Sequence, residues 1–188
     1  NIILIEKDDY LYRYLIDKYK NNKIVSIYNN DILKFKFKFI NNFNVVSNLP
    51  YNISSKVILK LFKHYKQIDE MVFMLQKEMA YKFDYNKIKI NKYKFFNELT
   101  CYYDICFSIN PSVFYPKPKV TSSVVKFKMK KKYINWKKAE SFSKNIFMNR
   151  RKKILNNINL KKSLNKEIAN KRIDQITFKE LIKIYNTF

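Results

Sequence analysis

The feature of this sequence that most constrains its fold is an alternation of short β-branched runs with stretches of helical spacing. Residues 1–5, 24–27 and 44–47 are apolar runs of strand length. Residues 10–19 and 54–65 instead place apolar side chains three and four positions apart. Strands that alternate with helices in this way are typical of a mostly parallel sheet covered by helices. The sequence therefore predicts an α/β fold.

Polar residues stand where the predicted strands end. Glu6 follows the first run, Asp31 the second and Asn48 the third. Because the ligands of open α/β sheets gather at the carboxyl ends of the strands, we expect these three side chains to share one binding edge. Ser54 and Ser55 offer an N-cap for the helix that follows Asn48.

The middle of the chain continues the sheet. The uninterrupted apolar residues 71–75 suit a central strand, and residues 102–109 and 122–128 have the composition of two further strands. Between these two lies the proline-bearing loop 110–119, and a loop of this length is more often functional than idle.

A lysine run at residues 128–132 marks a boundary. The residues that follow it, from Trp136 onward, have helical spacing and little strand character. We therefore expect a main domain at residues 1–130 and a small helical C-terminal domain at residues 131–188.

The formal net charge of +24 favours phosphate-rich partners. Two interpretations are open, because the codon bias of an AT-rich genome would also enrich the chain in lysine. No run approaches the roughly 18 consecutive apolar residues of a membrane span. We expect a soluble monomer of the cytoplasm, or of an organelle, that does not bind membranes.

The sequence offers little for metal binding or for nucleophilic catalysis. It has two cysteines, Cys101 and Cys106, and one histidine, His64, so no zinc-binding spacing can be assembled. We expect no metal site and two buried, free thiols. His64 has no carboxylate or serine motif beside it, and we assign it no catalytic role.

The most specific motif is Asn48-Leu49-Pro50-Tyr51, between a predicted strand and a predicted helix. Adenine N6 is a poor nucleophile because its lone pair is delocalised into the ring, so a site must hold both of its hydrogens. The Asn48 side-chain oxygen and the Leu49 carbonyl can accept them. Pro50 restricts the backbone of Leu49, and Tyr51 is placed to stack on a flipped adenine. In isolation the tetrapeptide could merely end a strand.

This motif belongs to a set of ordered segments that share their sequence pattern with one protein family. They are Asn48–Ser54, Phe73–Glu78, Pro111–Val120 with Ser123–Val125, and Asn149–Lys153. Over nearly the whole chain, the sequence resembles the ribosomal small-subunit RNA adenine dimethyltransferases, the KsgA family. The resemblance implies a Rossmann-like, class I S-adenosylmethionine-dependent methyltransferase domain with a small α-helical, RNA-binding C-terminal domain.

The resemblance also implies roles for single residues. Glu6 matches the acid that accepts hydrogen bonds from the ribose of S-adenosylmethionine, and Asp31 matches the aspartate that accepts from its adenine amino group. Asn48 would face both cofactor and substrate. Phe114 is similar to an aromatic residue that clamps the target adenine from its second face. Asp31 as a helix N-cap and Phe114 as ordinary loop packing are the open alternatives.

Basic residues in two places are expected to engage RNA phosphates without reading bases. Lys117 and Lys119 belong to the proline-bearing loop, and Arg150, Arg151 and Lys152 to the C-terminal domain. A solvated charged face is the alternative for Arg150–Lys152.

One departure from the family is that the 188 residues contain no glycine. The glycine loop that approaches the cofactor precedes the ribose-binding acid by about 20 residues, so it should precede residue 1, together with the first strand. Two interpretations are open: the sequence is a fragment that begins at the second strand, or the protein has lost cofactor binding.

The leading hypothesis is dimethylation of N6 of two adjacent adenines in the 3′-terminal hairpin of small-subunit rRNA, during assembly of the small ribosomal subunit. One alternative is a catalytically inactive RNA-binding assembly factor, and another is an Erm-type methyltransferase that acts on large-subunit RNA. A DNA-adenine methyltransferase shares Asn48–Tyr51 but not the context of Arg150–Lys152.

Overall fold

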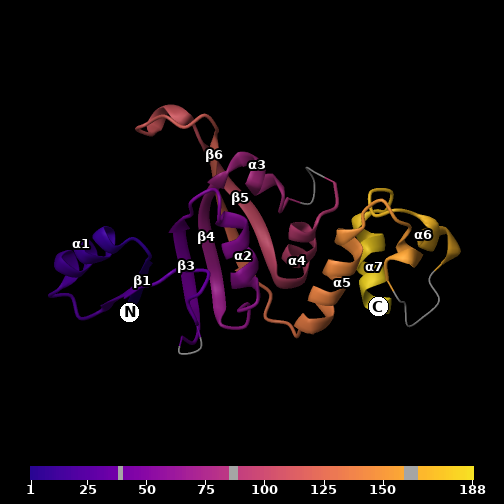
Figure 1. Ribbon diagram of the computed structural model, residues 1–188, viewed down its shortest axis with the longest axis horizontal. Helices are drawn as coiled ribbons and strands as arrows, with labels where there is room; N and C mark the ends of the chain where they lie inside the picture. Colours follow the sequence, from indigo (N-terminus) through magenta and orange to yellow (C-terminus); the bar gives the residue numbers. More distant parts are fainter. Residues whose placement is uncertain (38–39, 85–88, 159–164) are drawn as a thin grey trace.

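The computed structural model describes residues 1–37, 40–84, 89–158 and 165–188. A strand pair with one helix lies at one side, a four-stranded sheet in the middle and a group of helices at the other side (Figure 1). The elements are, in chain order, β1 (Ile2–Glu6), α1 (Asp9–Tyr19), β2 (Val25–Asn29), β3 (Phe43–Asn48), α2 (Ser54–Phe62), β4 (Ile68–Gln76), α3 (Lys77–Tyr81), α4 (Lys92–Thr100), β5 (Cys101–Ile109), β6 (Ser122–Met129), α5 (Trp136–Met148), α6 (Lys166–Asn170) and α7 (Phe178–Thr187).

The described strands form two sheets. β1 and β2 pair in parallel, and the second sheet has the order β3-β4-β6-β5. β3 and β4 are parallel, whereas β6 is antiparallel to both of its neighbours. β3, β4 and β5 therefore run in the same direction and β6 runs against them, so this sheet is mostly parallel, as predicted. β5 and β6 are joined by a loop that folds straight back, and a connection without a crossover helix produces antiparallel strands.

The N-terminal strand pair and its helix contribute little to the core. α1 begins at Asp8, whose carboxylate accepts from the Leu11 amide at 2.9 Å. The predicted apolar spacing of this helix is present, but no residue from 1 to 30 is buried and Leu11 is 47% exposed. α1 contacts β1 and β2, and this packing leaves its apolar residues at most partly buried.

α2 starts at the turn that follows Pro50, without a serine cap. Its N-cap residue is Ile53, so the prediction that Ser54 or Ser55 caps the helix is wrong. The Pro50 carbonyl accepts from the amides of Ile53 and Ser54, both at 3.1 Å, and the Ser54 hydroxyl donates to the Tyr51 carbonyl at 3.2 Å. A backbone carbonyl of this turn thus accepts from amides at the start of α2, in place of a serine side-chain oxygen.

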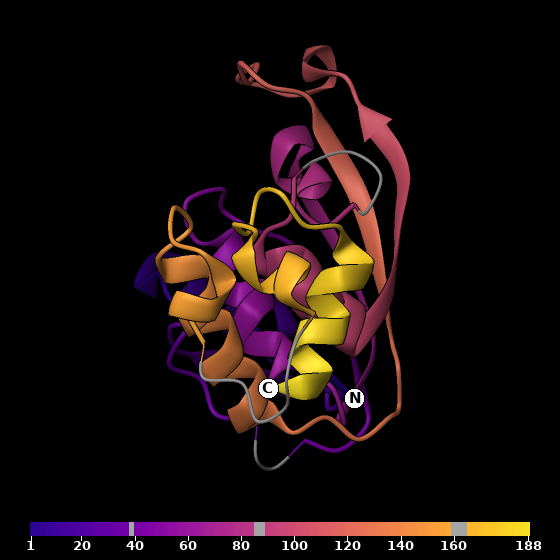
Figure 2. The ribbon, with the colours of Figure 1, turned by 90° about the vertical axis from the view of Figure 1, so that its right-hand side faces the viewer.

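The C-terminal helices share one core with the sheet. Phe95 of α4 contacts Phe142 of α5 and Tyr185 of α7, each with ring centroids 5.2 Å apart. Figure 2 faces this side of the molecule and shows α5 and α7 next to each other. Residues 131–188 contain α5, α6 and α7 with turns between them, and the domain boundary near residue 130 stays a prediction because the aromatic packing continues across it.

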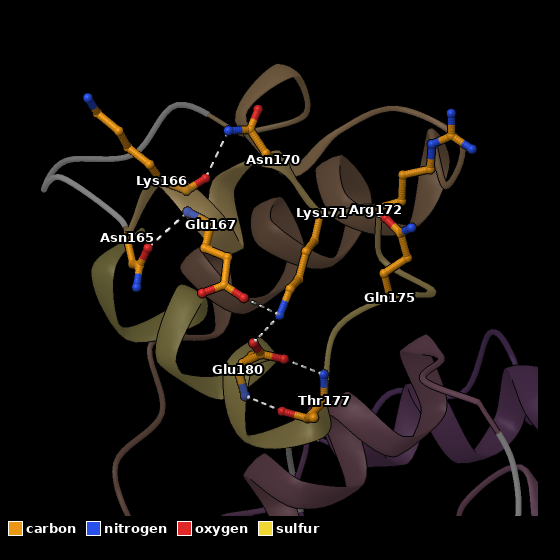
Figure 3. A network of polar contacts seen from close by, with 9 residues as sticks. All are labelled: Asn165, Lys166, Glu167, Asn170, Lys171, Arg172, Gln175, Thr177 and Glu180. Carbon is orange, nitrogen blue, oxygen red and sulfur yellow. Dashed lines mark hydrogen bonds and ion pairs between the residues drawn. The ribbon is translucent and has the colours of Figure 1, made fainter.

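A polar network joins α6 to the start of α7 (Figure 3). Lys171 pairs with Glu180 at 3.0 Å and with Glu167 at 3.6 Å. Glu180 and Thr177 also form a reciprocal capping box at the N-terminus of α7. The Thr177 amide, and after it the Lys171 ammonium, lower the pKa of Glu180.

The two cysteines differ in their surroundings. Cys101 is buried, which raises its pKa to about 12, whereas Cys106 is exposed. The prediction that both thiols are buried is thus wrong for Cys106. This residue lies at the register shift between Ile105 and Phe107, and such an irregularity turns side chains away from the regular alternation of a strand. Within the described segments, no helix is long and apolar enough to cross a membrane.

Candidate functional site

A pocket of about 350 Å³ lies where β3 ends. Its walls come from the residues just after β3, from β4 and from the loop between β5 and β6. They are Asn48, Leu49, Pro50, Tyr51, Met74, Phe114, Tyr115, Pro116 and Pro118. The pocket joins the tetrapeptide motif to an aromatic residue more than sixty positions later, which is the grouping that the family resemblance implies.

The backbone of the motif bends sharply at the edge of the sheet. Asn48 is the last residue of β3 and is exposed, while Leu49 is only 6% exposed. Asn48 is the register partner of Met74 in the parallel pair, so both residues reach the same end of the sheet. The buried Leu49 side chain anchors the bend, and the exposed Asn48 side chain stands at the opening of the pocket.

The Tyr51 ring is held by a residue that the sequence did not reveal. Its hydroxyl is hydrogen-bonded to the Ser122 hydroxyl at 3.0 Å. Ser122 is fully buried and is the first residue of β6, where it pairs with Gln76 and Ile109. Ser122 is held between β4 and β5 by strand pairing, and its hydrogen bond in turn positions the Tyr51 ring in the pocket wall.

The opposite wall is formed by the proline-bearing loop. A 3-10 turn at Pro111–Val113, capped by Asn110, precedes Phe114. Phe114 is half-buried in the pocket wall, and the peptide bond between Tyr115 and Pro116 is cis. Tyr115 is fully exposed and also lines the pocket. It carries no sequence signal beyond its place next to Phe114.

The predicted cofactor acids lie at the end of the other sheet. Glu6 ends β1, and its Oε1 accepts from the amides of Lys7 at 2.7 Å and Asp8 at 2.8 Å. The Glu6 carbonyl accepts from the Asn30 amide at 2.9 Å, which ties the ends of β1 and β2 together.

Asp31 stands directly beyond β2 in a turn of its own. Its Oδ1 accepts from the Leu33 amide at 2.8 Å, and its Oδ2 lies 3.6 Å from the Lys7 ammonium. The Leu33 amide, and to a lesser extent Lys7, lower the pKa of Asp31, so the side chain is a carboxylate at neutral pH. The bond to Leu33 closes a turn and occupies one oxygen, and because a turn and not a helix follows Asp31, the N-cap alternative is wrong.

A lysine from α2 supports this turn. The Lys60 ammonium donates to the carbonyls of Ile32 at 2.8 Å and Phe35 at 2.5 Å, and it lies over the Phe37 ring. Burial lowers the pKa of Lys60, while the nearby Asp31 carboxylate raises it. On a helix surface such a lysine resembles a solvated charge, so sequence inspection missed it.

The structure therefore gathers the predicted residues in two groups. Asn48 to Tyr51 and Phe114 line one pocket, whereas Glu6 and Asp31 lie together at the end of β1–β2 and do not line it. β1–β2 and β3 belong to two different described sheets, so an edge shared by all three polar residues stays a prediction. Across the described segments, no group of three His, Cys, Asp or Glu residues could hold a metal ion.

The predicted RNA-binding cations are mostly free to reach a ligand. Lys117, Lys119, Arg151 and Lys152 are exposed, the last two in the turn after α5. Arg150 differs because its guanidinium donates to the Ile90 carbonyl at 2.6 Å. This bond links the turn to the segment before α4 and gives Arg150 a structural contact that the sequence did not indicate.

Curated relatives of this chain share one description. "Ribosomal RNA small subunit methyltransferase A" of Malacoplasma penetrans is 39% identical over 166 residues, covering 84% of this chain and 59% of the relative. The protein of the same description from Hydrogenobaculum sp. is 31% identical over 191 residues, covering 99% of this chain and 72% of the relative. The chain thus spans about three fifths of the length of the Malacoplasma protein.

Two crystal structures share the fold. A dimethyladenosine transferase from Plasmodium falciparum superposes with a TM-score of 0.74 at 22% identity, covering 98% of this chain and 80% of that one. The 23S rRNA methyltransferase ErmE superposes with a TM-score of 0.73 at 15% identity, covering 100% and 81%. The predicted Rossmann-like methyltransferase fold is confirmed. The family model for ribosomal RNA adenine dimethylase matches residues 1–187, so the chain belongs to the ribosomal RNA adenine dimethylase family.

Proposed function

We propose that this chain carries the adenine-binding site of an enzyme that dimethylates N6 of two adjacent adenines in the 3′-terminal hairpin of small-subunit rRNA. The observation that carries the proposal is the pocket formed by Asn48–Tyr51 and Phe114. It combines polar acceptors at the end of a strand with aromatic side chains from two separate segments.

The chemistry of adenine N6 fits these walls. The Asn48 side-chain oxygen and the Leu49 carbonyl accept the two amine hydrogens, which holds the nitrogen lone pair toward the methyl donor. Tyr51 and Phe114 offer aromatic faces for the flipped base, and stacking of this kind is how single-stranded RNA bases are usually held. Alignment and exclusion of water are the main contributions of a protein to such a displacement.

The carboxylates at the end of β1–β2 suit S-adenosylmethionine as the cofactor. The amides of Lys7 and Asp8 both donate to Oε1 of Glu6, so Oε2 can accept from a ribose hydroxyl. Asp31 is ionised and can accept from an adenine amino group. When bound, S-adenosylmethionine supplies an electrophilic methyl group. Glu6 and Asp31 would hold its nucleoside part.

The exposed cations suit an RNA partner within the small ribosomal subunit. Lys117 and Lys119 lie on the same loop as Phe114, so phosphates next to a bound adenine would meet positive charge there. Arg151 and Lys152 add a second contact on the C-terminal helices. We place this function in the cytoplasm, where small subunits are assembled in bacteria, and in a monomer.

The second candidate function is an RNA-binding assembly factor without catalysis. It is favoured by the exposed cations, which would bind RNA whether or not the acids at β1–β2 hold a cofactor. The two functions differ in one product, methylated adenine.

Methylation of small subunits tests the proposal. The full-length protein and its Asn48→Ala variant are incubated with undermethylated small ribosomal subunits and methyl-labelled S-adenosylmethionine, and the label is mapped to single adenines. Asn44→Ala is the matched control, because Asn44 lies on β3 and contacts Glu70 instead of the pocket.

We expect labelling of adjacent adenines in the small subunit, reduced roughly 100-fold or more by Asn48→Ala and little changed by Asn44→Ala. Subunit binding without labelling would refute catalysis and leave the assembly-factor role. Labelling of large-subunit RNA instead would favour the Erm-type activity.

A further inference from the structure

A second hollow of about 220 Å³ lies beyond the adenine pocket. Its walls come from the end of β4, from α3 and from the residues just before β6. They are Gln76, Lys77, Glu78, Tyr81, Val120 and Thr121. None of these residues has a part in the function proposed above.

The two hollows follow one another along the same elements. Met74 lines the first and Gln76 the second, and side chains two positions apart on a strand point to the same face, about 7 Å apart. The loop before β6 continues in the same way, with Pro118 in the first hollow and Val120 in the second. An extended ligand that leaves the first hollow along β4 therefore meets the second.

The wall between the hollows is rigid. Gln76 pairs with Ser122, the residue that holds the Tyr51 hydroxyl. The Lys77 amide donates to the Thr121 carbonyl at 2.9 Å, which ties α3 to the loop. Backbone hydrogen bonds thus hold together the elements that line the two hollows.

The lining of the second hollow suits a nucleotide better than an inorganic anion. Tyr81 contributes a half-buried ring, and Gln76 an amide that can both donate to and accept from a base edge. The Glu78 carboxylate would repel a free anion but accepts from an exocyclic amino group. The exposed Lys77 ammonium, 5.8 Å from the centre of the Tyr81 ring, can pair with a backbone phosphate.

The volume also fits one base. A cavity of about 150 Å³ takes up a benzene ring, so the second hollow can admit a heterocycle that is also open to solvent on one side. We infer that the hollow lined by Gln76, Glu78 and Tyr81 binds the base of the nucleotide next to the target adenine. The inference rests on the proposed function, because the first hollow must hold that adenine.

Binding of the full-length protein to fluorescently labelled hairpin RNAs tests the inference. The intact hairpin is compared with hairpins that are abasic at the target adenine, at its 5′ neighbour or at its 3′ neighbour. Tyr81→Leu removes the ring, and Gln76→Ala removes the amide in case the first variant folds poorly. Tyr102→Leu is the matched control, because this exposed tyrosine pairs with Lys128 at the far end of β6 from Ser122.

We expect Tyr81→Leu to weaken binding of the intact hairpin about fivefold to tenfold, and to leave binding of one of the two neighbour-abasic hairpins unchanged. Gln76→Ala should act in the same direction, and Tyr102→Leu should have no effect. If the target-abasic hairpin binds more weakly than the intact one, two results for Tyr81→Leu would overturn the inference: an equal loss of binding on all hairpins, or no loss on any of them. If the target-abasic hairpin binds as tightly as the intact one, the proposed function fails and this inference fails with it.

Discussion

Removal of the Tyr51 hydroxyl separates the two tasks that the structure gives to this residue. In Tyr51→Phe the aromatic ring stays, but the 3.0 Å hydrogen bond to Ser122 is lost. In Tyr51→Leu the ring is lost as well. If the hydroxyl positions the ring and the ring holds the base, the first variant should mainly affect stability and the second mainly methylation.

The magnitude follows from the surroundings of the two hydroxyls. In Tyr51→Phe the hydroxyl of Ser122, a residue that is 0% exposed, is left without its partner, whereas in Ser122→Ala the hydroxyl of Tyr51, which is 39% exposed, can bond to water instead. A hydrogen bond of this kind contributes about 1 kcal/mol, which corresponds to a fall in Tm of roughly 3 °C in a domain of this size. Loss of base stacking in Tyr51→Leu should lower methylation by roughly tenfold or more.

A double-mutant cycle gives the decisive assay. Tyr51→Phe, Ser122→Ala and the double variant are unfolded in urea in the full-length protein, and methylation of small subunits is measured for each. We expect a coupling free energy of about 0.5–1 kcal/mol, because either substitution alone breaks the same bond. Coupling below about 0.3 kcal/mol would show that the hydroxyls act independently. A methylation defect in Tyr51→Phe as large as in Tyr51→Leu would refute the assignment of stacking to the ring.

Other predictions follow from the contacts around the site. Lys60→Met should weaken S-adenosylmethionine binding about tenfold, since two bonds from a charged donor to the Asp31 turn are lost; calorimetry checks this against Lys56→Met, an exposed control on the same helix. Glu180 has a pKa below its ordinary 4.5 in the fold, so its stabilisation is present above that value and is lost as the pH falls through the lowered pKa. Glu180→Gln should therefore reduce stability at neutral pH. The urea midpoint of unfolding, measured against pH, should then fall less steeply on the acid side than it does in the unaltered protein, and an equally steep fall would contradict this. Lys117→Ala and Lys119→Ala should each reduce the slope of log K against log salt for RNA by about 0.7–0.9. Arg150→Ala should instead destabilise the fold by breaking its bond to Ile90, with a smaller change in slope, as RNA titrations across a KCl series would show.

The elements and the site motif could be predicted from sequence because their signals are local. Apolar runs and helical spacing predicted β1 to β6, α1 and α2 to within a few residues, whereas α3 and α4 were not predicted. The position of Asn48 after a predicted strand gave its place at the end of β3. The grouping with Phe114 came from the family resemblance, since no local pattern relates residues so far apart. The structure then placed them in one pocket.

What could not be predicted depends on register and on long side chains. Ser122 meets Tyr51 only because β6 pairs with β4 and β5 in one particular register, which a serine at the start of a strand does not signal. Lys60 donates to carbonyls that lie 28 and 25 residues away in sequence, so its helix position gave no indication of these contacts. Cys106 is exposed by an irregularity that apolar alternation does not predict.

The lack of buried residues from 1 to 30 has a consequence for the energy landscape of the protein. Segments with few buried contacts open locally at a lower free energy than the core, and their amide hydrogens exchange sooner. Glu6 lies within this segment and Asp31 just after it. A ligand that contacts both carboxylates therefore binds only the form in which the segment is folded, which is here called the closed form. By mass action such a ligand stabilises that form. Closure of the β1–β2 unit and affinity for a nucleoside at its end are thus two measures of one equilibrium.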